Sequence, residues 1–548
     1  MIQKIKINNF RSIKEIEVDF WGLNAILWPN SVGKSNVLKA IDLVLGESWT
    51  TKGKVSRELF YNPENPLTIE IYFSTPIPYS YGGSEKQIRC ASIKMTCHNS
   101  DYTCEGRLWE NVYGDISNRG WGYYINEDFK RYCHFVYIPS QRDLADQMRV
   151  ASWTMLWKMM REIYNQYADF YWTDADWNVN RTEGEKNMKD EFKIAMESSK
   201  NFLEAEFSSS ALNFKKFHDV FVDRCKQNAI GMANDFHPSL DIYDVNWFYK
   251  TLQISITEEW QDDKQFNVEE VWSGMQNIVL LSIFQTYADL MGNRVIFGIE
   301  EPELFLYPHA QRALYRSFQE ISHTSQIIYT THNPNFLNAQ NPETLFLLRK
   351  NKTDWTFLLP KKTISFTLDE SLKAMVHFKN EQNEIFFANK VILVEGESDK
   401  VLLENLCSKW SFDLDSMGVS VVQCGWKTGV VYFIWVCDFL WIDYFWVWDR
   451  DATGKKWTVS DKFSHLRRSL DEWKGMEMID NLEEQILTID PSYSICSDKV
   501  KNAFVWSMNV LVENIPGFFD LVKSYIEPVW DITREPVSSW VSIEDVPF

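Results

Sequence analysis

Glycine, paired cysteines and long apolar runs are all scarce in this sequence of 548 residues. Its 22 glycines are outnumbered by 24 tryptophans, whereas an average protein has about 7% glycine. The 9 cysteines include no C-x-x-C pair, which argues against a disulfide-rich secreted scaffold and indicates a reducing, cytoplasmic compartment. With 45% hydrophobic and 24% charged residues, the composition excludes a disordered or low-complexity chain.

Positive charge is also in deficit. Lysine and arginine number 56 against 76 aspartates and glutamates, a formal net charge of −20, which argues against a general polyanion-coating protein or a binder of anionic membranes. A local basic groove or bound metal ions would still permit binding to nucleic acid. Asp438 and Asp443 interrupt the longest apolar run, 430–448, so we expect a buried helix and then a buried strand there, and no membrane partner.

A phosphate-binding loop lies near the N-terminus. A short apolar strand over 23–27 leads into Trp-Pro-Asn-Ser-Val-Gly-Lys-Ser-Asn at 28–36, and a helical run over 37–45 follows. This strand, loop and helix predict a P-loop, in which Lys34 neutralises nucleotide phosphates and the Ser35 hydroxyl reaches Mg²⁺. The residues of this loop predicted to contact ATP are Asn30, Gly33, Lys34, Ser35 and Asn36.

Two later strands end in polar residues that suit the same site. The apolar strand 294–300 ends in Glu300 and Glu301. Placed beside the P-loop strand, it would present Glu300 to Mg²⁺ and Glu301 to the attacking water. A second buried strand, 326–331, is followed by His332, which could sense the γ-phosphate.

One further element completes the pattern of an ATPase. Ser273 and Gly274 precede an apolar helix at 278–290, and a helix N-terminus of this kind binds anions. Each feature is weak alone, but all of them in this order predict a site for ATP and Mg²⁺.

A second pattern begins after residue 378. Strands over 391–394, 419–423 and 441–448 alternate with helical segments, the first of them at 400–406. This βαβαβ order predicts a parallel sheet, in which functional side chains gather at the carboxyl ends of the strands.

Four carboxylates lie at those predicted strand ends. Glu395 follows the first strand and Asp399 lies one helical turn further on, while Asp449 and Asp451 follow the last strand. Such a cluster would not stay ionised without cations, and hard oxygen ligands suit Mg²⁺ or Mn²⁺. Two such ions at a phosphodiester activate water and stabilise the leaving oxygen.

These motifs resemble known families. The P-loop, Ser-Gly, Glu-Glu-Pro-Glu and Thr-His-Asn-Pro in this order resemble the ABC-type ATPase heads of SMC-like proteins. The opening at 7–12 and the phrase at 301–309 are similar to the OLD (overcoming lysogenization defect) nucleases. E-G-x-x-D followed by D-x-D resembles a TOPRIM domain. The implied fold class is α/β, an ABC-type P-loop ATPase head with a helical insertion, followed by a Rossmann-like TOPRIM domain.

The resemblance also implies domain bounds, partners and further site residues. It implies a homodimer, in which the P-loop of one head faces the Ser-Gly of the other. Gln141 could match the glutamine of the family's Q-loop, Glu513 a late family carboxylate and Lys523 a late family lysine. The expected domains are an ATPase N-terminal half at 1–150, a helical insertion or dimerisation segment at 151–245, an ATPase C-terminal half at 246–378 and a TOPRIM nuclease domain at 379–548.

The function implied is an ATP-regulated, divalent-metal-dependent DNA endonuclease of bacterial anti-phage defence, similar to Gabija-type and retron-associated OLD effectors. A companion defence protein or a retron nucleic acid is a partner that this resemblance suggests. Two alternatives stay open: a topoisomerase-like or primase-like TOPRIM enzyme, and an ATP-gated DNA clamp or sensor with an inactive TOPRIM domain.

Three tryptophans stand where these motifs expect glycine, namely Trp28, Trp272 and Trp426. In a P-loop the glycine allows the backbone to approach phosphate closely, and tryptophan adds bulk there. Three such replacements indicate deliberate substitutions or errors in residue assignment. They leave the expected fold unchanged and weaken the expectation that this exact chain hydrolyses ATP.

Overall fold

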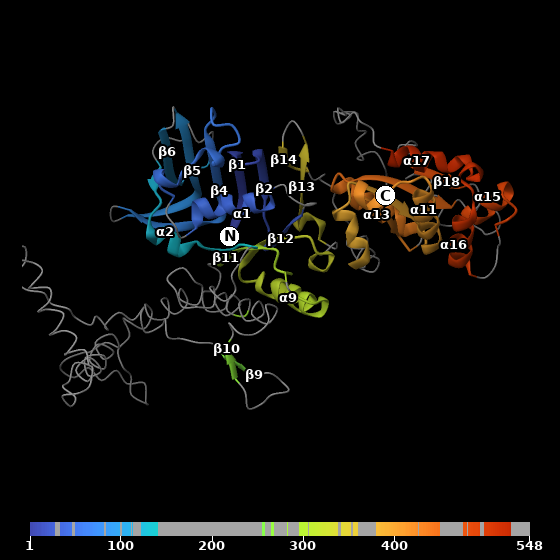
Figure 1. The fold of residues 1–548 in the computed structure, drawn as a ribbon. Coiled ribbons are helices and arrows are strands. Elements are labelled where there is room, and N and C mark those ends of the chain that lie inside the picture. The colour runs from blue at the N-terminus through green and yellow to red at the C-terminus, as the bar shows by residue number, and fades with distance from the viewer. Residues whose placement is uncertain are drawn as a thin grey trace, which may run out of the picture. The chain divides into compact units, whose positions relative to one another are not determined.

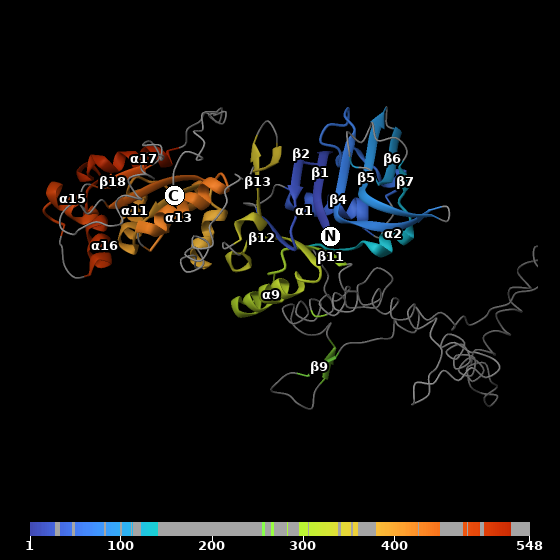
Figure 2. The same ribbon diagram turned by 180° about the vertical axis from the view of Figure 1, so that it is seen from behind.

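A computed structural model describes the chain in several stretches (Figures 1 and 2). These are residues 1–140 (without 28–32, 47–49, 82–83, 99–100, 111 and 113–121), 255–257, 265–267, 282, 295–359 (without 305, 338–340 and 352–354), 380–449 (without 426), 475–478 and 481–527 (without 494–497). The chain divides into two compact units: Met1–Ile138, Arg294–Glu303 and Pro308–Phe548 form one, and Pro139–Asn293 with Leu304–Tyr307 form the other. The insertion predicted at 151–245 lies outside the described residues.

The N-terminal part of the first unit is built on a 12-stranded sheet, ordered β7-β6-β5-β4-β1-β2-β14-β13-β3-β12-β11-β8. Strands β7 to β2 pair antiparallel, and β13, β3, β12, β11 and β8 pair parallel. The strands are β1 (Ile2–Phe10), β2 (Ile13–Asp19), β3 (Leu23–Leu27), β4 (Leu67–Tyr81), β5 (Ser84–His98), β6 (Asp101–Trp109), β7 (Tyr123–Tyr124), β8 (His134–Ile138), β11 (Val295–Glu300), β12 (Gln326–Thr331), β13 (Leu345–Asn351) and β14 (Trp355–Leu358).

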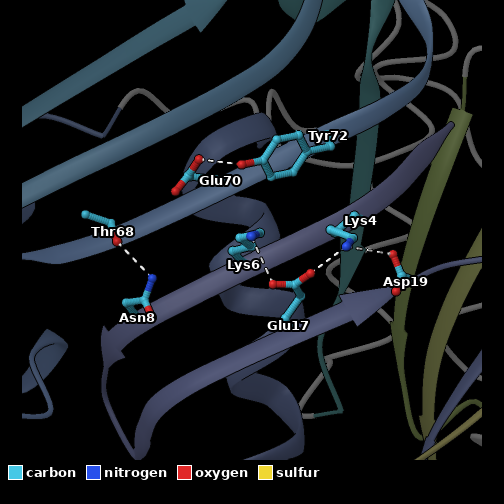
Figure 3. Close-up of polar contacts among 8 residues, drawn as sticks. All are labelled: Lys4, Lys6, Asn8, Glu17, Asp19, Thr68, Glu70 and Tyr72. Carbon is cyan, nitrogen blue, oxygen red and sulfur yellow. Dashed lines mark hydrogen bonds and ion pairs between the residues drawn. The ribbon is translucent and has the colours of Figure 1, made fainter. Parts of the chain in front are cut away.

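The antiparallel half follows from alternation along the strands. In β1, Ile5 and Ile7 are fully buried, whereas Lys4 and Lys6 point to the other face. On that face both lysines contact Glu17 of β2, with 3.0 Å between Lys6 Nζ and Glu17 Oε2 (Figure 3). Exposed ion pairs contribute about 0–1 kcal/mol, while each buried isoleucine contributes roughly 1.5–3 kcal/mol. Burial therefore fixes the register and the ion pairs follow it.

The parallel half is buried on both faces and places the strand ends of the ATPase motifs together. Every residue of β11 and β12 is buried, as expected of strands covered on both sides. Gly298 of β11 is required by close packing, because a Cβ there would lie 2.5 Å from Phe135 Cζ and 3.3 Å from Leu38 Cδ2. The prediction that β11 lies beside β3 is wrong, because β12 pairs with both strands and lies between them.

Short helical segments connect these strands. They are α1 (Lys34–Leu45), η1 (Lys52–Lys54), η2 (Arg57–Leu59), α2 (Glu127–Tyr132), α9 (Pro308–Ile321), η5 (Pro334–Phe336) and η6 (Pro342–Thr344). In the second unit, β9 (Ser255–Thr257) and β10 (Gln265–Asn267) pair antiparallel. No helix within the described stretches is long and apolar enough to cross a membrane.

The C-terminal part is a second, smaller α/β fold (orange to red in Figure 1). Its 4-stranded sheet is entirely parallel, in the order β16-β15-β17-β18. The predicted βαβαβ pattern is confirmed, and the apolar run 430–448 falls in a helix and then a strand whose apolar residues are largely buried. The elements are η7 (Asn380–Phe386), β15 (Lys390–Val394), α11 (Glu397–Lys409), α12 (Leu414–Met417), β16 (Val419–Gln423), α13 (Lys427–Phe439), β17 (Asp443–Asp449), β18 (Gly475–Met478), α15 (Leu482–Ile489), α16 (Lys499–Asn509), η9 (Val512–Asn514), η10 (Gly517–Phe519) and α17 (Asp520–Ile526).

Candidate active sites

The predicted P-loop joins β3 to α1. Gly33 caps α1 with a φ of 106°, a left-handed conformation that favours glycine. A Cβ at this position would lie 2.5 Å from Ser12 Oγ, so close packing also requires glycine. The first turn of α1 contains no acidic residue, which leaves the positive end of the helix dipole suited to phosphate.

Asn36 is buried, and its side chain is bonded inside the protein. Its Nδ2 donates to Ser12 Oγ at 2.9 Å, and its Oδ1 accepts from the Arg11 guanidinium at 3.5 Å. These bonds hold the turn after β1 against the first turn of α1. The structure thus gives Asn36 a supporting role, and its contact with nucleotide stays a prediction.

Glu300 ends β11 in a buried position, 3% exposed. The hydroxyl of Tyr137, on the neighbouring strand β8, donates to Glu300 Oε1 at 2.6 Å. Burial and then this carboxylate raise the pKa of Tyr137, so the phenol remains a donor at neutral pH. Tyr137 was not predicted, because nothing in the sequence shows which strand lies next to β11.

Glu301 and His332 come together at the ends of β11 and β12. Glu301 has a φ of 44°, unusual for a residue with a side chain, and its backbone N–H donates to Thr330 O at 2.9 Å. Its Oε1 lies 3.5 Å from His332 Nε2. The structure therefore brings together the predicted base and the predicted γ-phosphate sensor.

Glu303 is a further residue of this site that the sequence reading did not single out. It is 9% exposed, and its Oε1 accepts from Thr331 Oγ1 at 2.7 Å and from the backbone N–H of His332 at 3.0 Å. Glu303 thereby fixes the start of the His332 loop. The second glutamate of Glu-Pro-Glu was its signal in the sequence.

Several predicted residues lie outside the part of the chain that the structure describes. Ser35 is partly exposed at the second position of α1. The roles predicted for the undescribed residues stay predictions, as does the effect of the three tryptophans at glycine positions. Outside the described set are Asn30, Gln141, Ser273, Gly274, Asp451, Trp28, Trp272, Trp426 and the side chain of Lys34.

The C-terminal sheet brings Glu395 and Asp449 together at its carboxyl edge. Because β15 and β17 are neighbouring parallel strands, their ends meet there. Glu395 Oε1 accepts from the backbone N–H of Asp449 at 2.9 Å. Asp449 Oδ1 accepts in turn from the backbone N–H of Leu482, the first residue of α15, at 3.0 Å. Both carboxylates are thus oriented by the main chain.

Asp399 lies in the first turn of α11 and is 9% exposed. Its Oδ2 accepts from the backbone N–H of Gly396 at 3.0 Å. Burial raises the pKa of Asp399 to about 6, and nearby Glu483 adds to this, while the Gly396 N–H and Lys499 act in the opposite direction. A buried carboxyl of this kind gains from a cation that stabilises its ionised form.

Glu483 and Lys499 are residues of this site that we did not predict. Glu483 is 8% exposed in α15, and its Oε1 lies 3.0 Å from Lys499 Nζ at the start of α16. Burial lowers the pKa of Lys499, but Glu483, Asp449 and Asp399 outweigh it and raise the pKa overall. In the sequence Glu483 does not stand out, because a glutamate two residues after the N-cap residue Asn481 is typical of an ordinary helix start.

Glu513 and Lys523 belong to later elements of the C-terminal part. Glu513 is exposed in η9, and Lys523 is half-buried in the last turn of α17. Within the described residues, no hydrogen bond or ion pair joins either one to Glu395 or Asp449. Their roles in the site stay predictions, whereas Glu483 and Lys499 have direct structural support.

The carboxylates fit a divalent metal in their chemistry. All are hard oxygen donors, the type that Mg²⁺ and Mn²⁺ prefer. No group of three or more His, Cys, Asp or Glu side chains among the described residues is arranged to hold a metal ion by itself. Asp451, one of the predicted ligands, is not among the described residues.

Family models match both parts of the chain. One, described as AAA ATPase domain, matches residues 1–119 and 110–337. Another, described as overcoming lysogenization defect protein-like, TOPRIM domain, matches residues 386–451. The second match includes Glu395, Asp399, Asp449 and Asp451.

Three relatives align with most of the chain. An OLD nuclease of Thermus scotoductus is 24% identical over 97% of this chain and 99% of its own length. The Old nuclease of Escherichia phage P2 is 22% identical over 74% of this chain and 70% of its own length. Endonuclease GajA of Bacillus cereus is 21% identical over 82% of this chain and 75% of its own length. These matches confirm the similarity to OLD nucleases inferred from the motifs, and with it the expected α/β fold class.

Proposed function

We propose that this chain is an ATP-regulated, metal-dependent DNA endonuclease. It belongs to the family of AAA ATPase domains and also contains an OLD-like TOPRIM domain. The observation that carries the proposal is the hydrogen bond that joins Glu395 to Asp449 at the carboxyl edge of the parallel sheet. Lys499 lies within electrostatic reach of Asp449, Asp399 and Glu483, which supports the same site. The relatives named nucleases or endonucleases support the same reaction class.

In this proposal the carboxylates hold Mg²⁺ or Mn²⁺. Glu395, Asp449 and Asp451 would be the main ligands, with Asp399 and Glu483 nearby. Bound metal supplies a Lewis acid and a lowered pKa for its water. Water would attack the phosphorus of DNA and lose a proton to solvent, while the bond from phosphorus to the leaving sugar oxygen breaks and that oxygen takes up a proton. Lys499, whose pKa is raised at this site, remains cationic and would pair with a phosphate oxygen.

The N-terminal part would bind ATP and Mg²⁺ and regulate cleavage. In the proposal, Lys34 and Ser35 contact phosphates and Mg²⁺, Glu300 completes the metal site and Glu301 orients the attacking water beside His332. Asn30, Gly33 and Gln141 would add contacts from the same head. Ser273 and Gly274 would be contributed by a second copy of the chain, which makes the active form a homodimer.

The biological role we propose is anti-phage defence in a bacterial cytoplasm, which the similarity to endonuclease GajA supports. DNA is the proposed substrate. A companion defence protein or a retron nucleic acid would be a further partner, and a pull-down from infected cells would identify it.

Cleavage of a supercoiled plasmid tests the proposal. Wild-type protein with Mg²⁺ or Mn²⁺ should nick or linearise the plasmid, and EDTA should stop the reaction. Asp449→Asn should remove cleavage while ATP binding is retained, because Asp449 belongs to the C-terminal sheet. Plasmid that stays intact with wild-type protein under all metal conditions would favour the inactive clamp instead, and unchanged cleavage by Asp449→Asn would refute the site.

A further inference from the structure

The loop after His332 is held by a network of amide side chains. Asn333 Oδ1 accepts from the backbone N–H of Asn335 at 2.8 Å. Gln311 Oε1 of α9 accepts from Asn333 Nδ2 at 2.8 Å and from Asn335 Nδ2 at 3.1 Å. The carbonyl of Pro334 between them is therefore fixed in direction relative to His332.

Two neighbouring buried amides in η7 reach to opposite sides. Asn383 is 3% exposed and its Nδ2 donates to Pro334 O at 2.7 Å. Gln382 is 7% exposed and its Nε2 donates to Gln423 O at 2.8 Å. Pro334 follows the His332 loop, and Gln423 is the last residue of β16.

We call Gln382 and Asn383, with their bonds to the Gln423 and Pro334 carbonyls, the bridge. Its Gln423 end lies at the TOPRIM site. Gln423 pairs with Val394 in the parallel sheet, and the next backbone N–H, that of Cys424, donates to Val394 O at 2.8 Å. Val394 immediately precedes Glu395. A shift of η7 would therefore be transmitted to the strand that carries Glu395.

The bridge is anchored firmly enough to transmit a shift. Ile385 and Phe386 of η7 are fully buried, and the Arg349 guanidinium of β13 donates to Ala388 O at 2.7 Å. A buried amide that loses its hydrogen-bond partner is destabilising. Moving the Gln423 or Pro334 carbonyl away from its amide would leave a buried polar group unpaired, so η7 is expected to move together with both.

We propose that Gln382 and Asn383 are positioning residues that couple the nucleotide state at His332 to the Glu395 edge of the TOPRIM sheet. The proposal rests on the proposed function, because it needs ATP at the first site and metal-dependent cleavage at the second. Coupling of this kind requires that ATP favour one of two arrangements of the bridge. It differs from simple support, which would affect stability and both activities together.

The test uses full-length protein and two near-isosteric variants, Asn383→Leu and Gln382→Met. Two controls are matched to them. Glu384→Gln changes an exposed neighbour on η7. Asn405→Leu removes the hydrogen bond from Asn405 Nδ2 to Ser507 Oγ (2.9 Å) within the C-terminal part. Cleavage is measured with and without saturating ATP at fixed free Mg²⁺. ATP affinity and melting temperature are measured on the same samples.

Both bridge variants should keep ATP affinity and ATP-free cleavage within about twofold of wild type. The ratio of cleavage rates with and without ATP should move toward one by roughly 2- to 30-fold, the usual size of a change in coupling energy. The controls should keep the wild-type ratio. A wild-type ratio in both bridge variants, or parallel loss of stability and both activities, would overturn the coupling role.

Hydrogen exchange separates failure of the coupling from failure of the proposed function. Adding ATP to wild-type protein should change exchange in peptides spanning 390–425, and Asn383→Leu should abolish that change. This readout does not depend on DNA cleavage. The coupling is refuted if ATP does not change exchange in these peptides of the wild-type protein, or if the change persists in Asn383→Leu. Wild-type protein that binds ATP without cutting DNA refutes only the nuclease.

Discussion

The two sites orient their carboxylates by different means. Glu300 of the ATPase part accepts from the side chain of Tyr137, whereas Glu395 of the TOPRIM part accepts from the backbone N–H of Asp449. A side-chain partner can be removed by one substitution, but a backbone partner is fixed by the pairing of two strands. The TOPRIM site should therefore depend on the carboxylates themselves, and the ATPase site also on their neighbours.

The largest expected effect is on Glu395. Glu395→Gln should reduce DNA cleavage by at least about 10³-fold, because loss of a charged metal ligand removes much of the electrostatic stabilisation of the transition state. Glu397→Gln, an exposed neighbour two residues away, should cut at the wild-type rate. Plasmid cleavage at several Mg²⁺ concentrations checks this, and equal rates for the two variants would remove Glu395 from the site.

Glu301 tests the ATPase side of the comparison. Glu301→Gln should slow ATP hydrolysis by about 10²–10⁴-fold, the usual cost of losing a positioned base, and ATP binding should persist. Trapped ATP would then hold the proposed dimer closed. Phosphate release and size-exclusion chromatography with ATP provide the measurements, with exposed Glu320→Gln on α9 as the control. Normal turnover by Glu301→Gln would rule out the role.

Asp399 makes the metal-free protein sensitive to pH. Burial raises the pKa of Asp399 from 3.8 to about 6, so the folded state binds this proton more tightly than the unfolded state does. Its contribution to stability is therefore present below about pH 4 and is lost as the pH rises to about 6. The difference corresponds to about 3 kcal/mol, roughly a hundredfold in the unfolding equilibrium.

Urea unfolding in EDTA between pH 4 and 7 measures this contribution. Asp399→Asn should flatten the fall in stability across that range, whereas Asp520→Asn, an exposed residue of α17, should not. Saturating Mg²⁺ should also reduce the fall, because metal binding favours the ionised carboxylate. The same slope in wild type and Asp399→Asn would mean that the carboxyl titrates in its ordinary range.

Tyr137 gives the smallest of these effects. Tyr137→Phe removes the hydroxyl that orients Glu300 without removing the carboxylate, so ATP hydrolysis should fall by about tenfold, consistent with a hydrogen bond to a charged group. The Mg²⁺ concentration for half-maximal hydrolysis should rise, which a general loss of folding would not produce. An unchanged Mg²⁺ dependence would show that Tyr137 has no part in positioning Glu300.

Local sequence was sufficient for the strands and helices that carry the motifs. β3, β16 and the strand ends at Glu300, His332 and Glu395 are where the apolar runs indicated. Their alternation and length depend on neighbours along the chain, and the chain itself contains that information. The order of the strands in the sheet does not depend on chain neighbours alone, which is why β12 was not expected between β3 and β11.

Contacts between distant segments explain what was missed. Tyr137 lies 163 residues from Glu300, and only the pairing of β8 with β11 brings them together. Glu483 and Lys499 begin separate helices and reach the site because α15 and α16 start beside the sheet edge. Spacing along one sequence contains no signal for such meetings.

The most direct test of the central claim, that one chain combines a nucleotide switch with a metal-dependent nuclease, is cleavage as a function of ATP concentration. Free Mg²⁺ must be held constant, since ATP also chelates the metal. We expect the cleavage rate to change over the same ATP range in which ATP binds. A flat response in a protein shown to bind ATP would contradict it, and would mean that the ATPase part serves assembly or partner recognition instead.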